Sequence, residues 1–285
     1  MPVERTHDPS TDLIPAGELA TALAGPRPPT VLDVRWSITS GADPAGFSAG
    51  HIPGSQFVDL DADLAGPAGR LGRHPLPEPD VLQRTWRRLG LDDDSSVVVT
   101  DAADGTAAVR AWWLLRWSGL TRVAVLDGGL SQWTGHLEHG EPAAPDPGTV
   151  TVRPGGMPTA DIDDAAAAGG TGVLVDVRAA DRFSGAAEPL DPRAGHIPGS
   201  VNLPYARLYR ADGTMRDPAE LRDLLTAVGI RPGRPAVTSC GSGVSACHLI
   251  LAGRRVGIDV ALFPGSWSQW CTTDRPVASG PAGSA

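Results

Sequence analysis

The chain repeats itself, and this repeat constrains the fold more than any other feature of the sequence. Three stretches of the first half return in the same order in the second half: TVLDVRW (30–36) as GVLVDVRAA (172–180), SAGHIPGSQFVDLD (48–61) as RAGHIPGSVNLPY (193–205), and LDGGLSQW (126–133) as FPGSWSQW (263–270). The copies are about 140 residues apart, which is the size of one small domain. The sequence therefore predicts two tandem domains of the same fold.

A segment rich in proline, glycine and acidic residues, HLEHGEPAAPDPGTVTVRPGG, separates the two copies. It lacks the apolar periodicity of a helix or a strand, as is typical of a linker. We therefore expect a first domain over residues 1–138, a linker over 139–156 and a second domain over 157–285.

Within each copy, short runs of β-branched residues alternate with longer stretches of helical periodicity. In the first copy we expect strands at 31–34, 56–58, 97–100 and 123–126, and helices at 79–89 and 106–117. In the second copy we expect strands at 173–177, 201–203, 236–239 and 260–263, and helices at 218–228 and 244–254. Such alternation predicts an α/β fold in which a mostly parallel sheet is flanked by helices on both faces.

The composition excludes several classes of protein. With 41% apolar and 20% charged residues, the chain has the balance of a folded globular protein. Its net charge of -9 argues against a nucleic-acid or membrane-surface partner, because both require a basic face. The sequence has no long apolar run and no signal-like start, so we expect a cytoplasmic protein.

The cysteines indicate a reducing compartment. Cys240, Cys247 and Cys271 are too few and too clustered for a disulfide scaffold, and their odd number leaves at least one thiol free. All 24 basic residues are arginines, so Schiff-base chemistry on lysine is excluded. Anions must then be bound by arginine or by main-chain N–H groups.

One thiol occupies a reactive position. Cys240 follows an expected strand and begins the loop CGSGVS before an expected helix. In proteins with parallel sheets, ligands bind at such loops, at the carboxyl ends of the strands. Glycines at 241 and 243 allow main-chain N–H groups to point inward, and the start of the helix adds partial positive charge. This arrangement favours the thiolate form of Cys240, and the small neighbouring side chains leave room for one more atom on its sulfur.

Other interpretations of this loop are weaker. Cys240 as a mere buried apolar residue is the plain alternative, but its position and the glycine spacing favour a reactive thiol. Tyrosine phosphatases carry an arginine six residues after their cysteine, where this chain has Ala246. A zinc site is disfavoured because no CxxC pair exists. The matching loop of the first copy, TDAADGTAA (100–108), has acids instead of sulfur, so only the second copy can carry thiol chemistry.

Together these motifs resemble the two-domain rhodanese-type sulfurtransferases. The resemblance is carried by DVR and GHIPGS in both copies, CGSGVSA in the second and the ending GSWSQW, and it covers nearly the whole chain. In that family the first domain is inactive, and a cysteine of the second carries sulfane sulfur as a persulfide. The sulfur then passes to a thiol, cyanide or another acceptor. The resemblance thus implies two rhodanese-like domains, of which the second is catalytic through Cys240.

Within the family, the loop after the cysteine separates the sulfur donors. Thiosulfate sulfurtransferases typically show arginine and lysine there, whereas 3-mercaptopyruvate enzymes show glycine and serine. Gly241 and Ser242 therefore imply 3-mercaptopyruvate, and a neutral loop suits a monoanionic donor whose carboxylate is bound elsewhere. Two alternatives stay open: a thiosulfate sulfurtransferase on the same fold, and a persulfide carrier that is not an enzyme.

The resemblance also implies the remaining site residues. The family's substrate arginine falls on Arg182, and a second carboxylate ligand is expected before GHIPG, where Arg193 lies. Ser242 is expected to donate a hydrogen bond to the sulfur-donating substrate or to relay a proton. The loop residues expected to line the donor site are Gly241, Gly243, Val244 and Ser245.

The 3-mercaptopyruvate branch has been assigned a relay of serine, histidine and aspartate. His51 would match the histidine, and Asp43 is a candidate aspartate. Because the second copy repeats the same turn at His196, where no such relay is expected, a structural role is favoured for both histidines. No metal or organic cofactor is implied. The expected partners are a small-molecule sulfur donor and a thiol or cyanide acceptor, with a thioredoxin-like protein as a candidate.

Overall fold

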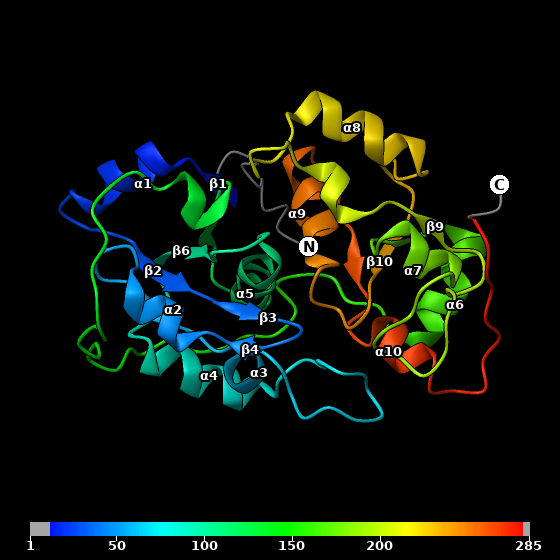
Figure 1. Ribbon diagram of the computed structural model, residues 1–285, viewed down its shortest axis with the longest axis horizontal. Helices are drawn as coiled ribbons and strands as arrows, with labels where there is room; N and C mark the ends of the chain where they lie inside the picture. Colours follow the sequence, from blue (N-terminus) through cyan, green and yellow to red (C-terminus); the bar gives the residue numbers. More distant parts are fainter. Residues whose placement is uncertain (1–11, 282–285) are drawn as a thin grey trace, which may run out of the picture.

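The computed structural model describes residues 12–281, so the outer ends of the two expected domains, at residues 1 and 285, lie outside the described part of the chain. Figure 1 shows two lobes side by side. The N-terminal lobe contains β1 (Leu13–Ile14), α1 (Ala16–Leu23), β2 (Thr30–Asp33), β3 (Trp36–Ser37), β4 (Gly41–Ala42), α2 (Pro44–Ala49), β5 (Gln56–Phe57), α3 (Leu60–Asp63), α4 (Pro79–Arg88), β6 (Ser96–Thr100), α5 (Thr106–Trp117), β7 (Arg122–Leu126) and the 3-10 helix η2 (Gly129–Gln132).

The C-terminal lobe repeats this plan with fewer elements. It contains α6 (Ile162–Thr171), β8 (Val173–Asp176), α7 (Ala180–Ser184), β9 (Val201–Asn202), the 3-10 helix η3 (Tyr205–Leu208), α8 (Pro218–Ala227), β10 (Ala236–Ser239), α9 (Cys247–Arg255), β11 (Ala261–Leu262) and α10 (Ser266–Trp270). Its sheet has the order β11-β10-β8-β9, and the N-terminal sheet has the order β1-β7-β6-β2-β5. All strand pairs in both sheets are parallel.

Alternate residues of the strands face opposite layers of helices, as a parallel sheet requires. In β6, Val97 and Val99 belong to the core cluster that includes α4 and α5, whereas Val98 packs with Leu19 of α1. In β8, Val175 faces α8 and α9, whereas Leu174 packs with α6 and α10. The predicted α/β fold, with parallel sheets covered on both faces, is confirmed.

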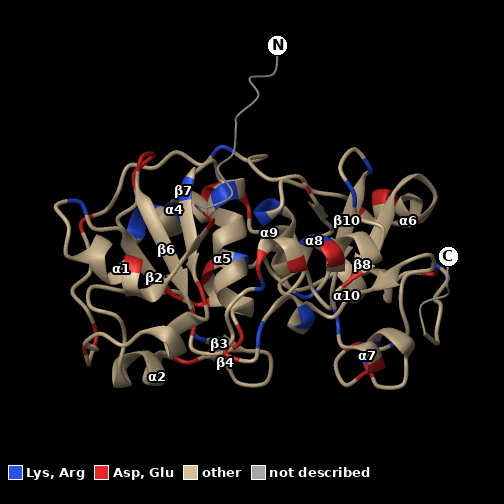
Figure 2. Cartoon of the chain, turned by 90° about the horizontal axis from the view of Figure 1, so that it is seen from above, with Lys and Arg blue, Asp and Glu red and all other residues tan. Residues whose placement is uncertain are grey.

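The two lobes share one core. A single cluster of buried side chains runs from α4 and α5 of the N-terminal lobe to α8 and α9 of the C-terminal lobe, and α5 packs against α9 at the seam (Figure 2). The residues that follow β6 and β10 line one pocket, so the carboxyl ends of these strands face the region where the lobes meet.

Among residues 12–281, every helix is too short or too polar to cross a lipid bilayer.

The predicted strands and longer helices are confirmed within one or two residues, with one exception. Helix α9 begins at Cys247 instead of Val244, because the N–H groups of Cys247 and His248 bond to the carbonyls of Val244 and Ser245, only three residues back. The tight loop therefore extends from Cys240 through Ala246, and its amides stay out of the regular helix.

Candidate functional site

Cys240 lies in a cradle of main-chain groups at the carboxyl end of β10. Its Sγ accepts a hydrogen bond from the N–H of Gly243 over 3.1 Å, and Ser266 Oγ lies 4.0 Å from the sulfur. The same Ser266 hydroxyl accepts from the Cys240 N–H over 3.0 Å. Gly243 has a φ of 78°, and a Cβ there would lie 2.3 Å from the carbonyl oxygen of Pro264. Only glycine permits this turn, so Gly243 shapes the cradle.

The matching loop of the N-terminal lobe holds a carboxylate in the same kind of cradle. Asp101, which follows β6 as Cys240 follows β10, accepts hydrogen bonds from the N–H groups of Ala103 and Gly105 over 3.0 Å and of Ala108 over 3.3 Å. Burial raises the pKa of Asp101 to about 6 in spite of these bonds. The strand-to-helix loop therefore directs main-chain N–H groups at the first side chain of the loop in both lobes, three at Asp101 and one at Cys240.

The hydroxyl of Ser242, two residues after Cys240, belongs to a chain of three side chains. Ser242 Oγ lies 2.7 Å from Nδ1 of His74, and Nε2 of His74 lies 3.3 Å from Oδ1 of Asp61. Trp36 donates to the other oxygen of Asp61 over 2.8 Å. Burial lowers the pKa of His74 from its usual 6.5 to about 4, outweighing the attraction of Asp61. His74 is therefore a neutral proton acceptor near pH 7.

This geometry corrects the candidate relay pair of His51 and Asp43, and it gives His51 the structural role that the repeat at His196 favours. His51 directs Nδ1 at the Phe47 carbonyl over 3.0 Å and stacks on the Phe47 ring, as His196 does with Phe183 in the other lobe. Asp43 caps helix α2 by accepting from the Gly46 N–H. Both side chains complete local turns, whereas His74 lies next to Ser242 and Asp61 lies next to His74.

Two arginines approach the cysteine loop. A Cβ on Gly241 would lie 3.3 Å from Nη2 of Arg73 and 3.4 Å from Nη1 of Arg182. Asp191 accepts from Nη1 of Arg73 over 2.7 Å and from Nη2 of Arg182 over 3.3 Å. Glu188 also accepts from Arg182, over 2.6 Å. The loop that contains no cationic side chain of its own is thus flanked by two guanidinium groups.

Arg193 does not join them, which corrects the expected second carboxylate ligand. Its guanidinium donates to the carbonyls of Thr273, over 2.9 Å, and Arg275, over 3.4 Å. Arg193 therefore ties the stretch before GHIPG to the C-terminal segment.

A pocket of about 360 Å³ brings most of these groups together, with walls from both lobes. The expected site residues that line it are Arg182, Cys240, Gly241, Ser242, Val244 and Ser245. Further lining residues are Trp36, Ser37, Ile38, Arg73, Ala103, Asp104, Thr106, Arg178, Ala179, Leu190 and Tyr205. Cys240 is only 1% exposed and borders this pocket, so bulk water has little access to its sulfur.

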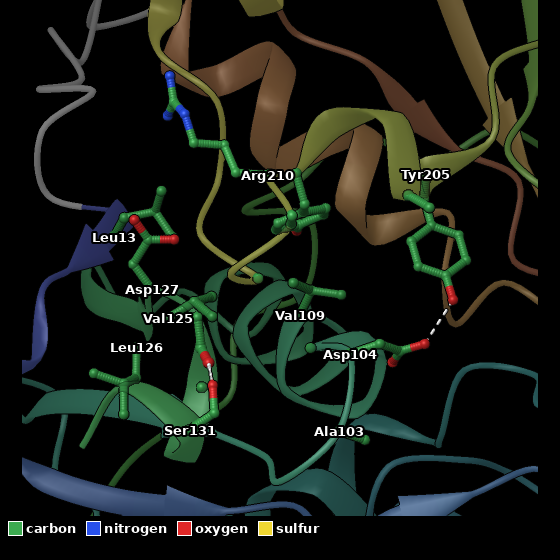
Figure 3. A pocket seen from close by; sticks show the side chains of 17 residues that line it. Leu13, Ala103, Asp104, Val109, Val125, Leu126, Asp127, Ser131, Tyr205 and Arg210 are labelled. Atoms are coloured by element: carbon green, nitrogen blue, oxygen red, sulfur yellow. Dashed lines mark hydrogen bonds between the residues drawn. The ribbon is translucent and has the colours of Figure 1, made fainter. Parts of the chain in front are cut away.

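A second cavity of about 260 Å³ lies between the lobes, and one hydrogen-bonded pair borders both cavities. Tyr205 donates to Oδ2 of Asp104 over 2.6 Å (Figure 3). The Tyr205 ring stacks on His248, which lies 3.1 Å from the Thr106 hydroxyl and 2.5 Å from that of Tyr209. This cluster fixes the N-terminal lobe against the wall of the cysteine pocket.

The other two cysteines are unpaired thiols. Both are buried, and burial raises the pKa of Cys247 to about 12 and also raises that of Cys271. Thiolate chemistry is therefore disfavoured at both positions.

Comparison with known proteins places these features in a family. The sequence profile of the Rhodanese-like domain matches residues 15–136 and again 160–273. A Mycobacterium tuberculosis relative, SseB, provisionally named a thiosulfate sulfurtransferase, is 42% identical over 95% of this chain and 98% of its own. A Pseudomonas aeruginosa relative, provisionally named a 3-mercaptopyruvate sulfurtransferase, is 40% identical over 95% of this chain and 99% of its own. The crystal structure of SseA from Escherichia coli, described as a 3-mercaptopyruvate sulfotransferase with the rhodanese fold, matches with a TM-score of 0.79 and 31% identity, over 90% of this chain and 99% of SseA.

Proposed function

This chain belongs to the rhodanese family of sulfurtransferases, and we propose that its sulfur donor is 3-mercaptopyruvate. The observation that carries the proposal is the hydrogen bond between Ser242 and a neutral His74 beside Cys240. When sulfur leaves 3-mercaptopyruvate, the carbon left behind must gain a proton. When sulfur leaves thiosulfate, sulfite departs without one. A proton relay at the thiol is therefore useful for the first donor and idle for the second.

In the first half-reaction, the Cys240 thiolate attacks the sulfur of 3-mercaptopyruvate. The new S–S bond forms as the C–S bond breaks, and the electron pair of the broken bond stays on carbon as the enolate of pyruvate. The proton of the donor's thiol passes through Ser242 and His74 and returns to that carbon. The products are pyruvate and a Cys240 persulfide anion, so atoms and charge balance.

In the second half-reaction, a thiolate or cyanide attacks the outer sulfur of the persulfide. The S–S bond breaks and its electron pair returns to Cys240 as thiolate, which the Gly243 N–H stabilises. Arg182 binds the donor's carboxylate, and Gly241, Val244 and Ser245 form the wall along which the donor lies. A thioredoxin-like protein supplies the physiological thiol. A reducing compartment such as the cytoplasm suits three cysteines that are all unpaired.

A thiosulfate sulfurtransferase is the second candidate, and the provisional name of the Mycobacterium tuberculosis relative favours it. Arg73 and Arg182 also provide positive charge close to Gly241. Against this candidate, the carboxylates of Glu188 and Asp191 already bind these guanidinium groups, which lowers their attraction for a dianion.

Steady-state rates with each donor test the proposal, with cyanide as the acceptor. We expect kcat/KM for 3-mercaptopyruvate to exceed that for thiosulfate by at least about tenfold, a difference of about 1.4 kcal/mol. Cys240→Ser should abolish turnover with both donors, because no persulfide can form. Cys247→Ser, at the start of α9, is the matched control and should retain turnover. A preference for thiosulfate would overturn the donor, and activity in Cys240→Ser would overturn the mechanism.

A further inference from the structure

One buried arginine of the N-terminal lobe has no carboxylate partner. Arg110, in the middle of α5, is fully buried, and it forms no ion pair with any group among residues 12–281. Burial lowers the pKa of Arg110, but an arginine stays protonated near pH 7 in spite of this. A buried charge without a counter-charge is costly, so an anion close to Arg110 would stabilise the protein.

Main-chain carbonyl groups from both lobes hold the guanidinium of Arg110. Nη1 donates to the carbonyl of Gly243 over 3.2 Å, and Nη2 donates to three carbonyls of the N-terminal lobe, those of Leu64 (3.3 Å), His74 (3.2 Å) and Pro75 (3.4 Å). Carbonyl oxygens carry only partial negative charge, so they orient the guanidinium without neutralising it. Arg110 thus connects the cysteine loop with the loop of His74 and keeps its positive charge.

The contact with Gly243 places this charge beside the cysteine loop. Gly243 accepts from Arg110 through its carbonyl and donates through its N–H to Cys240 Sγ over 3.1 Å. Two sulfur groups, those of Cys240 and Cys247, interact electrostatically with the guanidinium. Burial raises the pKa of Cys247 to about 12, so its thiol is neutral near pH 7. Of these two groups, only Cys240 can therefore provide the opposite charge.

The other arginines around the cysteine loop already have carboxylate partners. Three arginines face three carboxylates there, so together they contribute little net charge. These groups are Arg73, Arg178 and Arg182 with Asp176, Glu188 and Asp191. Tyr205 of η3 also interacts with Cys240, but burial raises the pKa of its phenol, which is therefore neutral. Arg110 is thus the neighbouring cation that no carboxylate offsets among residues 12–281.

Burial alone disfavours a thiolate at position 240. Cys240 is as buried as Cys247 and Cys271, and at both of these positions burial raises the pKa of the thiol. A nearby positive charge offsets such a penalty, because it favours the charged form of the sulfur. The sulfur of Cys240 and the guanidinium of Arg110 are therefore complementary.

We propose that Arg110 is a positioning residue of the cysteine loop, whose positive charge stabilises the anionic sulfur of Cys240 across the seam between the lobes. This inference rests on the Cys240 thiolate of the proposed function, but it holds for either sulfur donor. It gives the N-terminal lobe, which has no cysteine, a part in activating the thiol of the other lobe.

A purely structural role is the competing explanation, in which Arg110 only ties the loops together through their carbonyls. The two explanations differ in how the reactivity of Cys240 depends on pH. Loss of a stabilising charge lowers the thiolate fraction, so the rate falls most at low pH and approaches the wild-type rate as the pH rises. A distorted loop lowers the rate by the same factor at every pH.

The experiment measures alkylation of Cys240 by iodoacetamide from pH 6 to about pH 10, with the modified cysteine identified by peptide mass spectrometry. Arg110→Gln keeps a hydrogen-bond donor for the carbonyls but removes the charge. We expect its rate at pH 7 to be at least about tenfold below that of the wild type, and the difference to narrow as the pH rises.

Arg116→Gln is the matched control, because it removes another buried arginine of α5, one that pairs with Asp12 and donates to the Thr121 carbonyl. Its rate should stay within about twofold of the wild type at every pH. Arg110→Lys keeps the charge but loses the planar fork, and its rate at pH 7 should stay within about threefold of the wild type. This variant decides the question if Arg110→Gln does not fold, since a rate lowered equally at every pH would contradict the role of the charge.

The outcomes separate this inference from the proposed function. Alkylation of wild-type Cys240 faster than that of Cys247, with the same pH profile in Arg110→Gln, would overturn the role of Arg110 alone. Alkylation of wild-type Cys240 no faster than that of Cys247 at pH 7 would overturn the reactive thiolate and this inference together. A loss in Arg110→Gln that is equal at every pH would assign Arg110 to the structural role.

Discussion

At the scale of single residues, the chemistry depends on where one proton is held. His74 is kept neutral by burial, which lowers its pKa to about 4, so its free nitrogen can take a proton from Ser242 throughout the range in which proteins usually work. Asp61 contacts the other nitrogen and fixes the orientation of the ring. The relay therefore needs no charged histidine in the resting state.

His74→Gln should separate the two donors. We expect kcat with 3-mercaptopyruvate to fall about 100-fold, because the enolate carbon loses its proton source, while the rate with thiosulfate stays within about threefold. His136→Gln, which replaces an exposed histidine, is the control. Steady-state assays with both donors measure the ratio. An equal loss with both donors would mean that His74 supports the loop and relays no proton.

The sequence identifies those site residues that follow one another on one strand-to-helix loop. Cys240, Gly241 and Ser242 could be predicted because the repeat, the glycine spacing and the family motif all meet there. His74 could not, because it lies 168 residues before Ser242, in a loop of the other lobe without a repeat partner. Arg73 was missed for the same reason. Contacts between lobes depend on how the lobes dock, which a local pattern does not encode.

At the scale of elements, the two strand-to-helix loops share one main-chain arrangement. The loop after β6 directs three N–H groups at the Asp101 carboxylate, and the loop after β10 directs one at the Cys240 sulfur in the same position. In the N-terminal lobe, the Asp101 carboxylate occupies the position that the Cys240 sulfur has in the C-terminal lobe. Asp101, one of the acidic residues of the loop in the first copy, therefore has a structural role, because it accepts hydrogen bonds from the N–H groups of that loop.

Asp101→Ala should destabilise the protein strongly, since three main-chain N–H groups, of which that of Ala108 is buried, would lose their acceptor. We expect the midpoint of thermal unfolding to fall by at least about 5 °C. Asp101→Asn, which keeps one acceptor oxygen, should lose less. Asp94→Ala, at a side chain that is 93% exposed, is the control and should shift the midpoint by less than about 1 °C. Equal midpoints for Asp101→Ala and Asp94→Ala would contradict the proposed role of the carboxylate.

Elements with a clear apolar pattern were predictable from sequence, including the two-residue strands β5, β9 and β11, whereas elements without such a pattern were not. The strands β2, β6 and β10 contain buried β-branched residues, and α5 matches its expected bounds of 106–117. Helix α6, with the sequence IDDAAAAGGT, was missed because alanine and glycine give no apolar stripe and glycine weakens a helix. It forms because Asp161 caps it and Ala165 and Ala168 pack against the sheet.

At the scale of the whole molecule, the repeat is asymmetric in function because the two lobes build one site. The pocket beside Cys240 takes Trp36, Arg73 and Asp104 from the N-terminal lobe. The shared core along α5 and α9 fixes the position of these residues relative to Cys240. The N-terminal lobe, which has no cysteine, thereby contributes part of the wall of the pocket beside Cys240.

His248 provides a test of this docking through pH. It is fully buried between the lobes, against Thr106, Tyr205 and Tyr209, and burial lowers its pKa from 6.5 to about 4. A group whose pKa is lowered in the folded state stabilises the fold above its unfolded pKa, and this stabilisation is lost as the pH falls. The contribution of His248 is therefore complete above about pH 6.5 and disappears toward pH 4.

His248→Gln should remove this pH dependence. Asp101 acts in the opposite direction, because its pKa is raised to about 6, so the informative quantity is the difference between the wild type and the variant. We expect urea unfolding to show that the wild type loses about 3 kcal/mol more than His248→Gln between pH 7 and pH 4. His136→Gln should follow the wild type, since that side chain is exposed. Parallel curves for the wild type and His248→Gln would mean that His248 accepts a proton without loosening the contact between the lobes.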